Sequence, residues 1–99
     1  MQQLKRATAR RCRIAEINPE KDIRVRVLGK VIDKAEDMVI IDDGTGKMEV
    51  VAENPDIEIG HNAFVFARIL PLENGYEARA EIIRPATELD VETYRKVFG

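Results

Sequence analysis

Apolar and basic residues alternate regularly between positions 23 and 32, which is the pattern of a strand with one buried and one exposed face. Gly29 interrupts the apolar row where a side chain is expected. This interruption predicts a bulge or a sharp coil that allows one long strand to serve two sheets. The apolar row holds Ile23, Val25, Val27 and Val31, and the opposite row holds Arg24, Arg26 and Lys30.

Further short apolar segments follow, each separated from the next by residues that favour turns. The stretch from Asp42 to Gly46 carries two glycines and two aspartates, which favour a tight hairpin. Pro55 lacks the backbone donor that a strand needs, so the chain must turn there or make a brief helical passage. Asn74 followed by Gly75 predicts a second hairpin. The strands expected after the first one span 38–41, 47–52, 63–70 and 76–84.

The spacing of apolar residues changes after residue 85. Pro85 ends the last expected strand, and Thr87 can cap a helix that runs from about 88 to 98. Such a helix of about three turns is marginal in isolation, so it must pack on its own barrel or on a partner. Its apolar residues recur at spacings of two to four and are the predicted partner-binding set: Leu89, Val91, Tyr94, Val97 and Phe98.

Two stretches carry a resemblance to a known family. Val27 to Ile32, followed by Val39 to Val51 with its Asp-Gly-Thr-Gly turn, resembles the first three strands of replication protein A subunits and their archaeal relatives. The order of elements is also that of OB-fold barrels. The resemblance implies an all-β fold, a five-stranded Greek-key OB-fold barrel with a C-terminal helix. The expected parts are a basic N-terminal arm or soluble tail (1–13), the barrel (14–85) and the amphipathic helix (86–99).

A lone barrel with a short terminal helix is similar to the small or middle subunit of replication protein A, in which such helices build the trimer. The resemblance therefore implies an accessory subunit of a single-stranded-DNA-binding complex in replication and repair, joined to a larger subunit through its helix. Two alternatives stay open. The chain is an autonomous binder of single-stranded DNA or RNA, or it is a protein-interaction barrel outside DNA metabolism.

Charge sets a condition on any nucleic-acid role. The 99 residues have room for one domain, and their formal net charge is −2, so phosphates can be bound only by a local basic patch. Acidic residues such as Glu49, Glu77 and Glu81 compete for the same bases. Tyr76 is a candidate for stacking because the loop between the last two strands commonly borders OB-fold ligands. The predicted nucleic-acid-binding residues are Arg24, Arg26, Lys30, Lys47, Arg68 and Tyr76.

The fourth expected strand is apolar on both of its faces. Phe64 and Phe66 share one side, and Val65, Ala67 and Ile69 share the other. One of these rows must therefore face away from the barrel interior. We expect the terminal helix, a partner or a stacked base to cover it.

Catalytic machinery is not visible in the sequence. Serine is absent, His61 is the sole imidazole and Cys12 the sole thiol, so we expect no enzyme activity, no metal and no cofactor. The Gly44 to Lys47 stretch is not a phosphate loop, because Ile41 replaces the upstream glycine and Met48 replaces the hydroxyl. No apolar run approaches the ~20 residues of a membrane span, and no secretory signal is visible. We expect a cytoplasmic, nucleoid-associated protein without membrane partners.

Overall fold

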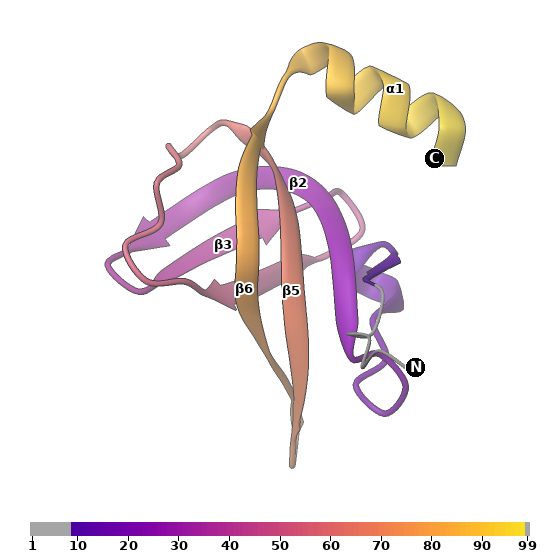
Figure 1. Ribbon diagram of the computed structural model, residues 1–99, viewed down its shortest axis with the longest axis vertical. Coiled ribbons are helices and arrows are strands. Elements are labelled where there is room, and N and C mark those ends of the chain that lie inside the picture. Colours follow the sequence, from indigo (N-terminus) through magenta and orange to yellow (C-terminus); the bar gives the residue numbers. More distant parts are fainter. Residues whose placement is uncertain (1–8, 99) are drawn as a thin grey trace, which may run out of the picture.

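One long strand, β2 (Arg24–Ala35), belongs to both halves of the barrel. Its residues 24–30 pair antiparallel with β5 (Asn62–Leu72), and its residues 30–35 pair antiparallel with β3 (Met38–Asp42). Figure 1 shows the strand curving between these two partners. The prediction that this strand serves two sheets is confirmed. The bulge itself lies between Val31 and Asp33, however, and not at Gly29.

The remaining strands complete a closed ring in this computed structural model, which describes residues 9–98 apart from the side chains of 95, 97 and 98. β3 pairs antiparallel with β4 (Lys47–Val51), β4 pairs parallel with β6 (Gly75–Ala86), and β6 pairs antiparallel with β5. Because β2 also pairs with β5, the five expected strands form a barrel, as the sequence predicted.

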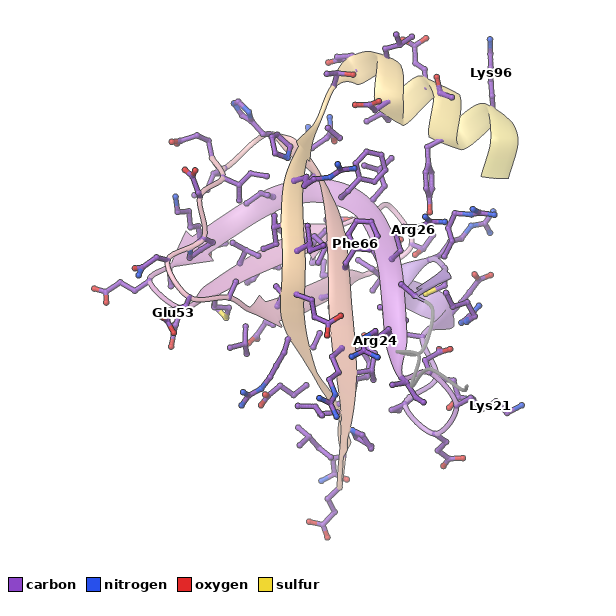
Figure 2. All side chains as sticks on the ribbon, in the orientation of Figure 1. Lys21, Arg24, Arg26, Glu53, Phe66 and Lys96 are labelled. Atoms are coloured by element: carbon purple, nitrogen blue, oxygen red, sulfur yellow. The ribbon has the colours of Figure 1, made fainter. Side chains whose placement is uncertain are left out.

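Helix α1 (Glu88–Phe98) follows β6 and extends away from the strands (Figure 1). Thr87 caps it as predicted: its hydroxyl accepts a hydrogen bond from the Asp90 amide at 3.0 Å, and its own amide donates to Asp90 Oδ2 at 2.9 Å. The labelled side chain of Lys96 points outward from the far end of the helix (Figure 2). Within the described range, no helix is long and apolar enough to cross a membrane.

Strand β6 runs past the predicted end of its strand, to Ala86. Pro85 lies opposite Ala63 of β5, whereas β4 pairs only with Ala78 and Arg79 further back along β6. The missing proline donor is tolerated because one side of the strand is unpaired at this point.

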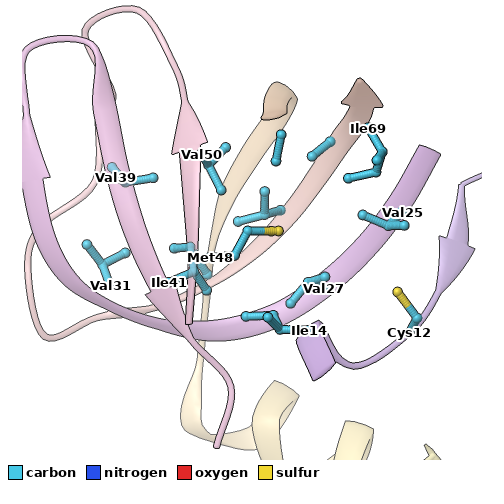
Figure 3. Close-up of a cluster of buried hydrophobic side chains, with 14 of the residues drawn as sticks. Cys12, Ile14, Val25, Val27, Val31, Val39, Ile41, Met48, Val50 and Ile69 are labelled. Atoms are coloured by element: carbon cyan, nitrogen blue, oxygen red, sulfur yellow. The ribbon is translucent and has the colours of Figure 1, made fainter. Parts of the chain in front are cut away.

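The core consists of the inward row of each strand (Figure 3). Val25, Val27 and Val31 of the predicted apolar row are completely buried. Ile23 is an exception, since it precedes β2 and is 55% exposed, so its assignment to the buried row was wrong. The barrel interior is filled mainly by β-branched residues, which pack well on a pleated surface: Val25, Val27, Val31, Val39, Ile41, Val50 and Val65.

The N-terminal segment closes one end of this core. β1 (Arg10–Arg11) pairs parallel with β2, and a short 3₁₀ turn, η1 (Ile14–Glu16), follows it. Cys12 and Ile14 are buried in the core cluster. Residues 10–13, which the sequence assigned to the basic arm, are thus part of the described barrel, and residues 1–8 of that arm lie outside the described range.

Gly29 is needed for packing rather than for a bulge. A Cβ atom at this position would lie 2.4 Å from Ile41 Cγ2 and 3.0 Å from the Asp42 carbonyl oxygen. Ile41 is fully buried and branched at Cβ, so it has little freedom to withdraw. Gly29 therefore lets β3 approach β2 closely where β2 passes from one sheet to the other.

We predict that Gly29→Ala lowers the free energy of unfolding by about 1 to 3 kcal/mol, the usual cost of overpacking a core. Urea denaturation of the full chain measures this. Lys34→Ala on the exposed part of the same strand is the control and should stay within ~0.5 kcal/mol of the parent. Equal stability of Gly29→Ala and the parent would contradict the close approach described here.

Candidate nucleic-acid interface

The outer surface of β2, β5 and β6 carries most of the predicted basic residues. The strand registers arrange their outward side chains in rows across the three strands. In order along β2, the rows are Arg24, Arg68 and Arg79; Arg26, Phe66 and Ile82; Leu28, Phe64 and Arg84; and Lys30, Asn62 and Ala86. We call this surface the basic face, and it consists of Arg24, Arg26, Lys30, Arg68, Arg79 and Arg84 around Phe64, Phe66 and Ile82.

A bulge in the pairing of β5 with β6 creates part of this face. The register shifts between Phe66 and Ala67, which pair with Ile82 and Ala80, so Glu81 is the extra residue of the bulge. As a result Arg79 and Arg84 both face outward, although they lie five positions apart and simple alternation would place them on opposite sides. This is why periodicity alone did not assign these two arginines to the interface.

The first row places three arginines on adjacent strands. Arg24 donates from Nε to Glu81 Oε1 at 2.9 Å, which confirms that acidic neighbours pair with these bases. Arg79 forms an ion pair with Glu77 on its own strand. Arg68, which lies between them, is exposed and has no ion pair among residues 9–98. The middle of the row is therefore a positive charge that remains available to an anion.

Aromatic and aliphatic side chains form the centre of the basic face. Phe64 and Phe66 are half-buried and Ile82 is 50% exposed, while the opposite row of β5 is buried in the core. The prediction that one of the two apolar rows faces outward is thus confirmed. The guanidinium of Arg26 lies 6.0 Å from the centre of the Phe66 ring, as the labelled residues in Figure 2 illustrate.

The Arg26 side chain has one buried hydrogen-bond donor. Its Nε atom is inaccessible and has no hydrogen-bond partner within the part of the chain that the structure describes. A buried donor without an acceptor has a desolvation cost, which Arg26 carries in this arrangement.

Helix α1 lies next to one end of the basic face. The Tyr94 ring meets the Phe64 ring edge to face, with 6.2 Å between the ring centres. Val91 and Tyr94 are half-buried, whereas Leu89 is 72% exposed. The side chains of Val97 and Phe98, also predicted to bind a partner, lie outside the described residues. The helix therefore covers part of the outer apolar row and keeps an apolar residue exposed.

Two predicted binding residues lie outside the rows of the basic face. Lys47 is exposed on β4 opposite Asp42 of β3, and Asp42 in turn lies opposite Lys30, so Lys47 continues the row of Lys30 two strands further round the barrel. Tyr76 is half-buried and packs against the core cluster, and burial raises the pKa of its hydroxyl. The structure thus groups Arg24, Arg26, Lys30 and Arg68, places Lys47 beyond Asp42 in the row of Lys30, and does not bring Tyr76 to them.

The surface that OB-folds usually offer to oligonucleotides is acidic at one end. That surface covers the second and third barrel strands and the loop between the first two strands. Here this loop lies against the segment after β4, since the amides of Ala52 and Asn54 donate to the carbonyl oxygens of Asp37 and Glu36 at 2.9 Å. Both segments are rich in carboxylates: Asp33, Glu36, Asp37, Glu53, Asp56 and Glu58. Phosphates are therefore repelled there and favoured on the basic face.

A groove of about 890 Å³ opens between α1, the bend of β2, the turn after β3 and the N-terminal segment. Its acidic residues are held in place by local amides. Asp43 accepts from the amides of Ile14, Thr45 and Gly46, and Asp42 Oδ1 accepts from Gly44 at 2.8 Å. The lining includes Arg11, Arg13, Glu16, Leu28, Lys30, Ile32, Asp42, Asp43, Asn62, Val91 and Tyr94.

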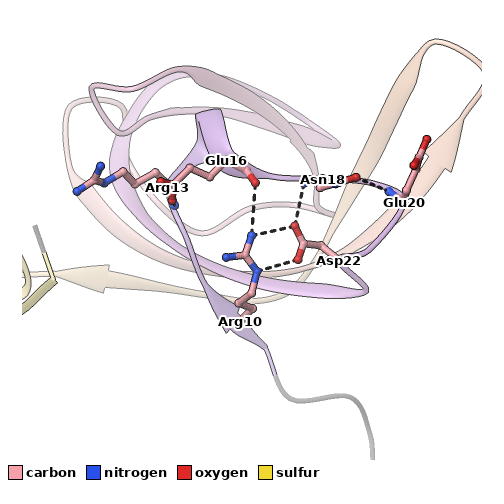
Figure 4. Close-up of polar contacts among 6 residues, drawn as sticks. All are labelled: Arg10, Arg13, Glu16, Asn18, Glu20 and Asp22. Atoms are coloured by element: carbon pink, nitrogen blue, oxygen red, sulfur yellow. Dashed lines mark hydrogen bonds and ion pairs between the residues drawn. The ribbon is translucent and has the colours of Figure 1, made fainter.

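An ion pair holds in place the N-terminal segment that lines one side of this groove (Figure 4). Arg10 donates from Nε and Nη2 to the two carboxylate oxygens of Asp22 at 2.8 and 3.0 Å, and the Asn18 amide donates to Oδ2 at 2.8 Å. The Asp22 side chain is only 6% exposed. The hydrogen bonds from Arg10 hold the pKa of Asp22 below its usual value.

Among the described residues, no three His, Cys, Asp or Glu side chains gather into a possible metal site. Cys12 is buried, which raises the pKa of its thiol.

Comparison with known proteins identifies the fold. No protein-family model matches the sequence, and no curated protein matches it at a significant level. Among solved structures, a chain of the S. pombe Stn1–Ten1 complex is 22% identical with a TM-score of 0.72, over 96% of this chain and 92% of that one. The second OB-fold domain of replication protein A from Methanococcus maripaludis is 15% identical with a TM-score of 0.61, over 80% and 97%.

A third similar structure is a replication protein A heterotrimer bound to single-stranded DNA. The match is 16% identical with a TM-score of 0.60, and it covers 82% of this chain and 72% of that one. These likenesses confirm the predicted OB-fold barrel.

We predict that Asp22→Asn lowers the free energy of unfolding at pH 7 by about 1.5 to 3 kcal/mol, the range for hydrogen bonds to charged groups. Because the pKa of Asp22 is lowered on folding, its contribution is complete above the unfolded value of about 3.9 and is lost as the pH falls through the folded value. Urea denaturation at pH 7 and pH 3 should therefore show a smaller pH effect in Asp22→Asn. Glu20→Gln, an exposed neighbour, is the control, and identical behaviour of the two variants would exclude this role for Asp22.

Proposed function

We propose that this protein is an accessory subunit of a complex that binds single-stranded nucleic acid, with the basic face as its strand-binding surface and α1 as its attachment to a larger subunit. The observation that supports this proposal best is the row of Arg24, Arg68 and Arg79 beside the half-buried rings of Phe64 and Phe66. Its role is binding and assembly rather than catalysis.

A single strand suits the chemistry of the basic face. Nonspecific single-strand binding combines cations that follow the backbone with rings on which bases stack. The face offers cations on three strands and half-buried Phe64 and Phe66 between them. Six basic residues lie there, and two of them, Arg24 and Arg79, form ion pairs with Glu81 and Glu77, although the whole chain is acidic.

The modest surface argues for a subunit rather than a self-sufficient binder. Two of the three cations in the first row are already paired with carboxylates, which weakens their attraction for phosphates. A second subunit bound to the same strand raises the overall affinity by effective concentration. The exposed Leu89 on α1 is suited to such an attachment. The similar structures from an Stn1–Ten1 complex and a replication protein A heterotrimer agree with this arrangement.

We predict that Arg68→Glu weakens binding of a labelled twelve-nucleotide strand by about tenfold at low salt, as measured by fluorescence anisotropy. Arg68→Ala should reduce the slope of log affinity against log salt by ~0.7, the value for one phosphate contact on a single strand. Glu81→Gln removes the partner of Arg24 and should strengthen binding.

Lys34→Glu is the matched control, because it makes the same charge change on an exposed residue of β2 beyond its bulge, beside the acidic loop. An equal loss in Lys34→Glu and Arg68→Glu would show that net charge, and not the basic face, governs binding. No binding at low salt by the isolated chain would refute the autonomous binder and leave strand contact to the assembled complex.

We predict that Leu89→Glu on the tagged full chain removes the co-purifying larger subunit, because a carboxylate cannot be buried in an apolar helix contact. Size-exclusion chromatography with light scattering measures the complex. Lys96→Glu, on the same helix, should leave it intact, and thermal melting checks that both variants are folded. Retention of the complex by Leu89→Glu would contradict the proposed attachment.

A further inference from the structure

We propose that the groove beneath α1 receives one base of the bound strand, which stacks on Tyr94, while the rest of the strand lies on the basic face. This inference rests on the proposed function and adds to it a site for the nucleobase. The predicted stacking residue, Tyr76, is not involved.

The groove continues the basic face without a break. Leu28, Lys30 and Asn62 form the last rows of that face, and the same three residues line the groove. From Arg24 to Lys30 the β2 backbone covers ~20 Å, at about 3.3 Å per residue. A strand that runs along the face from the arginine row therefore arrives at the opening below α1.

The groove is lined by both positive and negative side chains. A nucleotide likewise has a negative phosphate at one end and a base with hydrogen-bond donors at the other. Lys30 stands on the β2 side, and the positive charges of Arg11 and Arg26 lie close enough to Tyr94 to oppose the burial-induced rise in its pKa. These cations suit a phosphate. Asp42, the last residue of β3 and the strand partner of Lys30, and Asp43, the first residue of the turn after β3, supply the negative charge.

The carboxylates of Asp42 and Asp43 suit a base edge better than a phosphate. The amino groups of cytosine and adenine donate hydrogen bonds to carboxylates. Asp42 receives the Gly44 amide on Oδ1 only, and its Oδ2 has no donor among residues 9–98, so it can accept from such a group. A repelled phosphate and an attracted base edge together orient the nucleotide.

Size and shape agree with this occupant. The groove volume of about 890 Å³ lies within the ~300 to 1,000 Å³ typical of small-ligand clefts. Val91 and Tyr94 lie three positions apart on α1 and so face the groove from one side of the helix. Leu28 and Ile32 supply apolar contacts on the barrel side. The mixture of one ring, a few apolar groups and opposed charges fits a nucleotide better than the apolar face of a partner helix.

The composition of the chain allows a direct test. The protein contains two tyrosines and no tryptophan, so tyrosine emission reports Tyr76 and Tyr94 alone. In full-length Tyr76→Phe the signal comes only from Tyr94, and in Tyr94→Phe it comes only from Tyr76. We expect a dC12 oligonucleotide to quench most of the emission of Tyr76→Phe in step with binding, after inner-filter correction. The emission of Tyr94→Phe should stay nearly constant.

An affinity measurement provides a second readout. Tyr94→Leu should bind dC12 about tenfold more weakly, within the ~1 to 3 kcal/mol that stacking contributes per base. Its salt slope should not change, because no charge is lost. Tyr94→Phe keeps the ring and should bind like the parent. Circular dichroism of both variants checks that α1 is retained.

The possible outcomes separate the inference from the proposed function. The inference is overturned if Tyr76→Phe binds the oligonucleotide without a change in emission, or if Tyr94→Leu binds with the affinity of the parent. The groove would then be a site for a protein segment, and the basic face would remain the proposed strand-binding surface. If Arg68→Glu weakens binding and Tyr94 is quenched, both are supported. Absence of binding by the parent chain overturns the inference and refutes the autonomous binder, whereas the proposed accessory subunit stands.

Discussion

The close approach of β3 to β2 at Gly29 is the contact on which the barrel depends. At this point β2 leaves β5 and begins to pair with β3, and the space that a Cβ atom would need is filled by Ile41. That approach lets β3 begin to pair with β2 at the point where β2 is still paired with β5. Val27 and Val31, on either side of Gly29, are fully buried there.

Closure of the barrel also determines where the charged side chains lie. Once β2, β5 and β6 lie side by side, their outward residues form rows, and the bulge at Glu81 adds Arg79 and Arg84 to the same surface. Carboxylates gather instead on the loops after β2 and β4, which lie against one another. A chain with a net negative charge thereby presents a positive face, and this face is not the one that OB-folds usually use.

The two ends of the chain complete this surface. The N-terminal segment is tied to the barrel by the Arg10–Asp22 ion pair and by the Ile14 amide, which donates to Asp43. Helix α1 approaches from the other side through Tyr94 and Phe64. The groove lies between these two attachments, so its walls come from segments at opposite ends of the sequence.

The sequence by itself determined the five strands of the barrel, the hairpins and the capped terminal helix, because these features depend on local periodicity and turn residues. The closed barrel followed from the resemblance to replication protein A subunits and the order of the elements. Alternation correctly buried Val25, Val27 and Val31, and Thr87 correctly marked the start of α1. Only the tertiary structure decided that Ile23 is exposed, that Tyr76 packs inward and that Arg79 and Arg84 share a face with Arg24. These outcomes depend on a bulge and on strand registers between distant segments. Pairing across such distances is set by how the whole core packs, which no local pattern records.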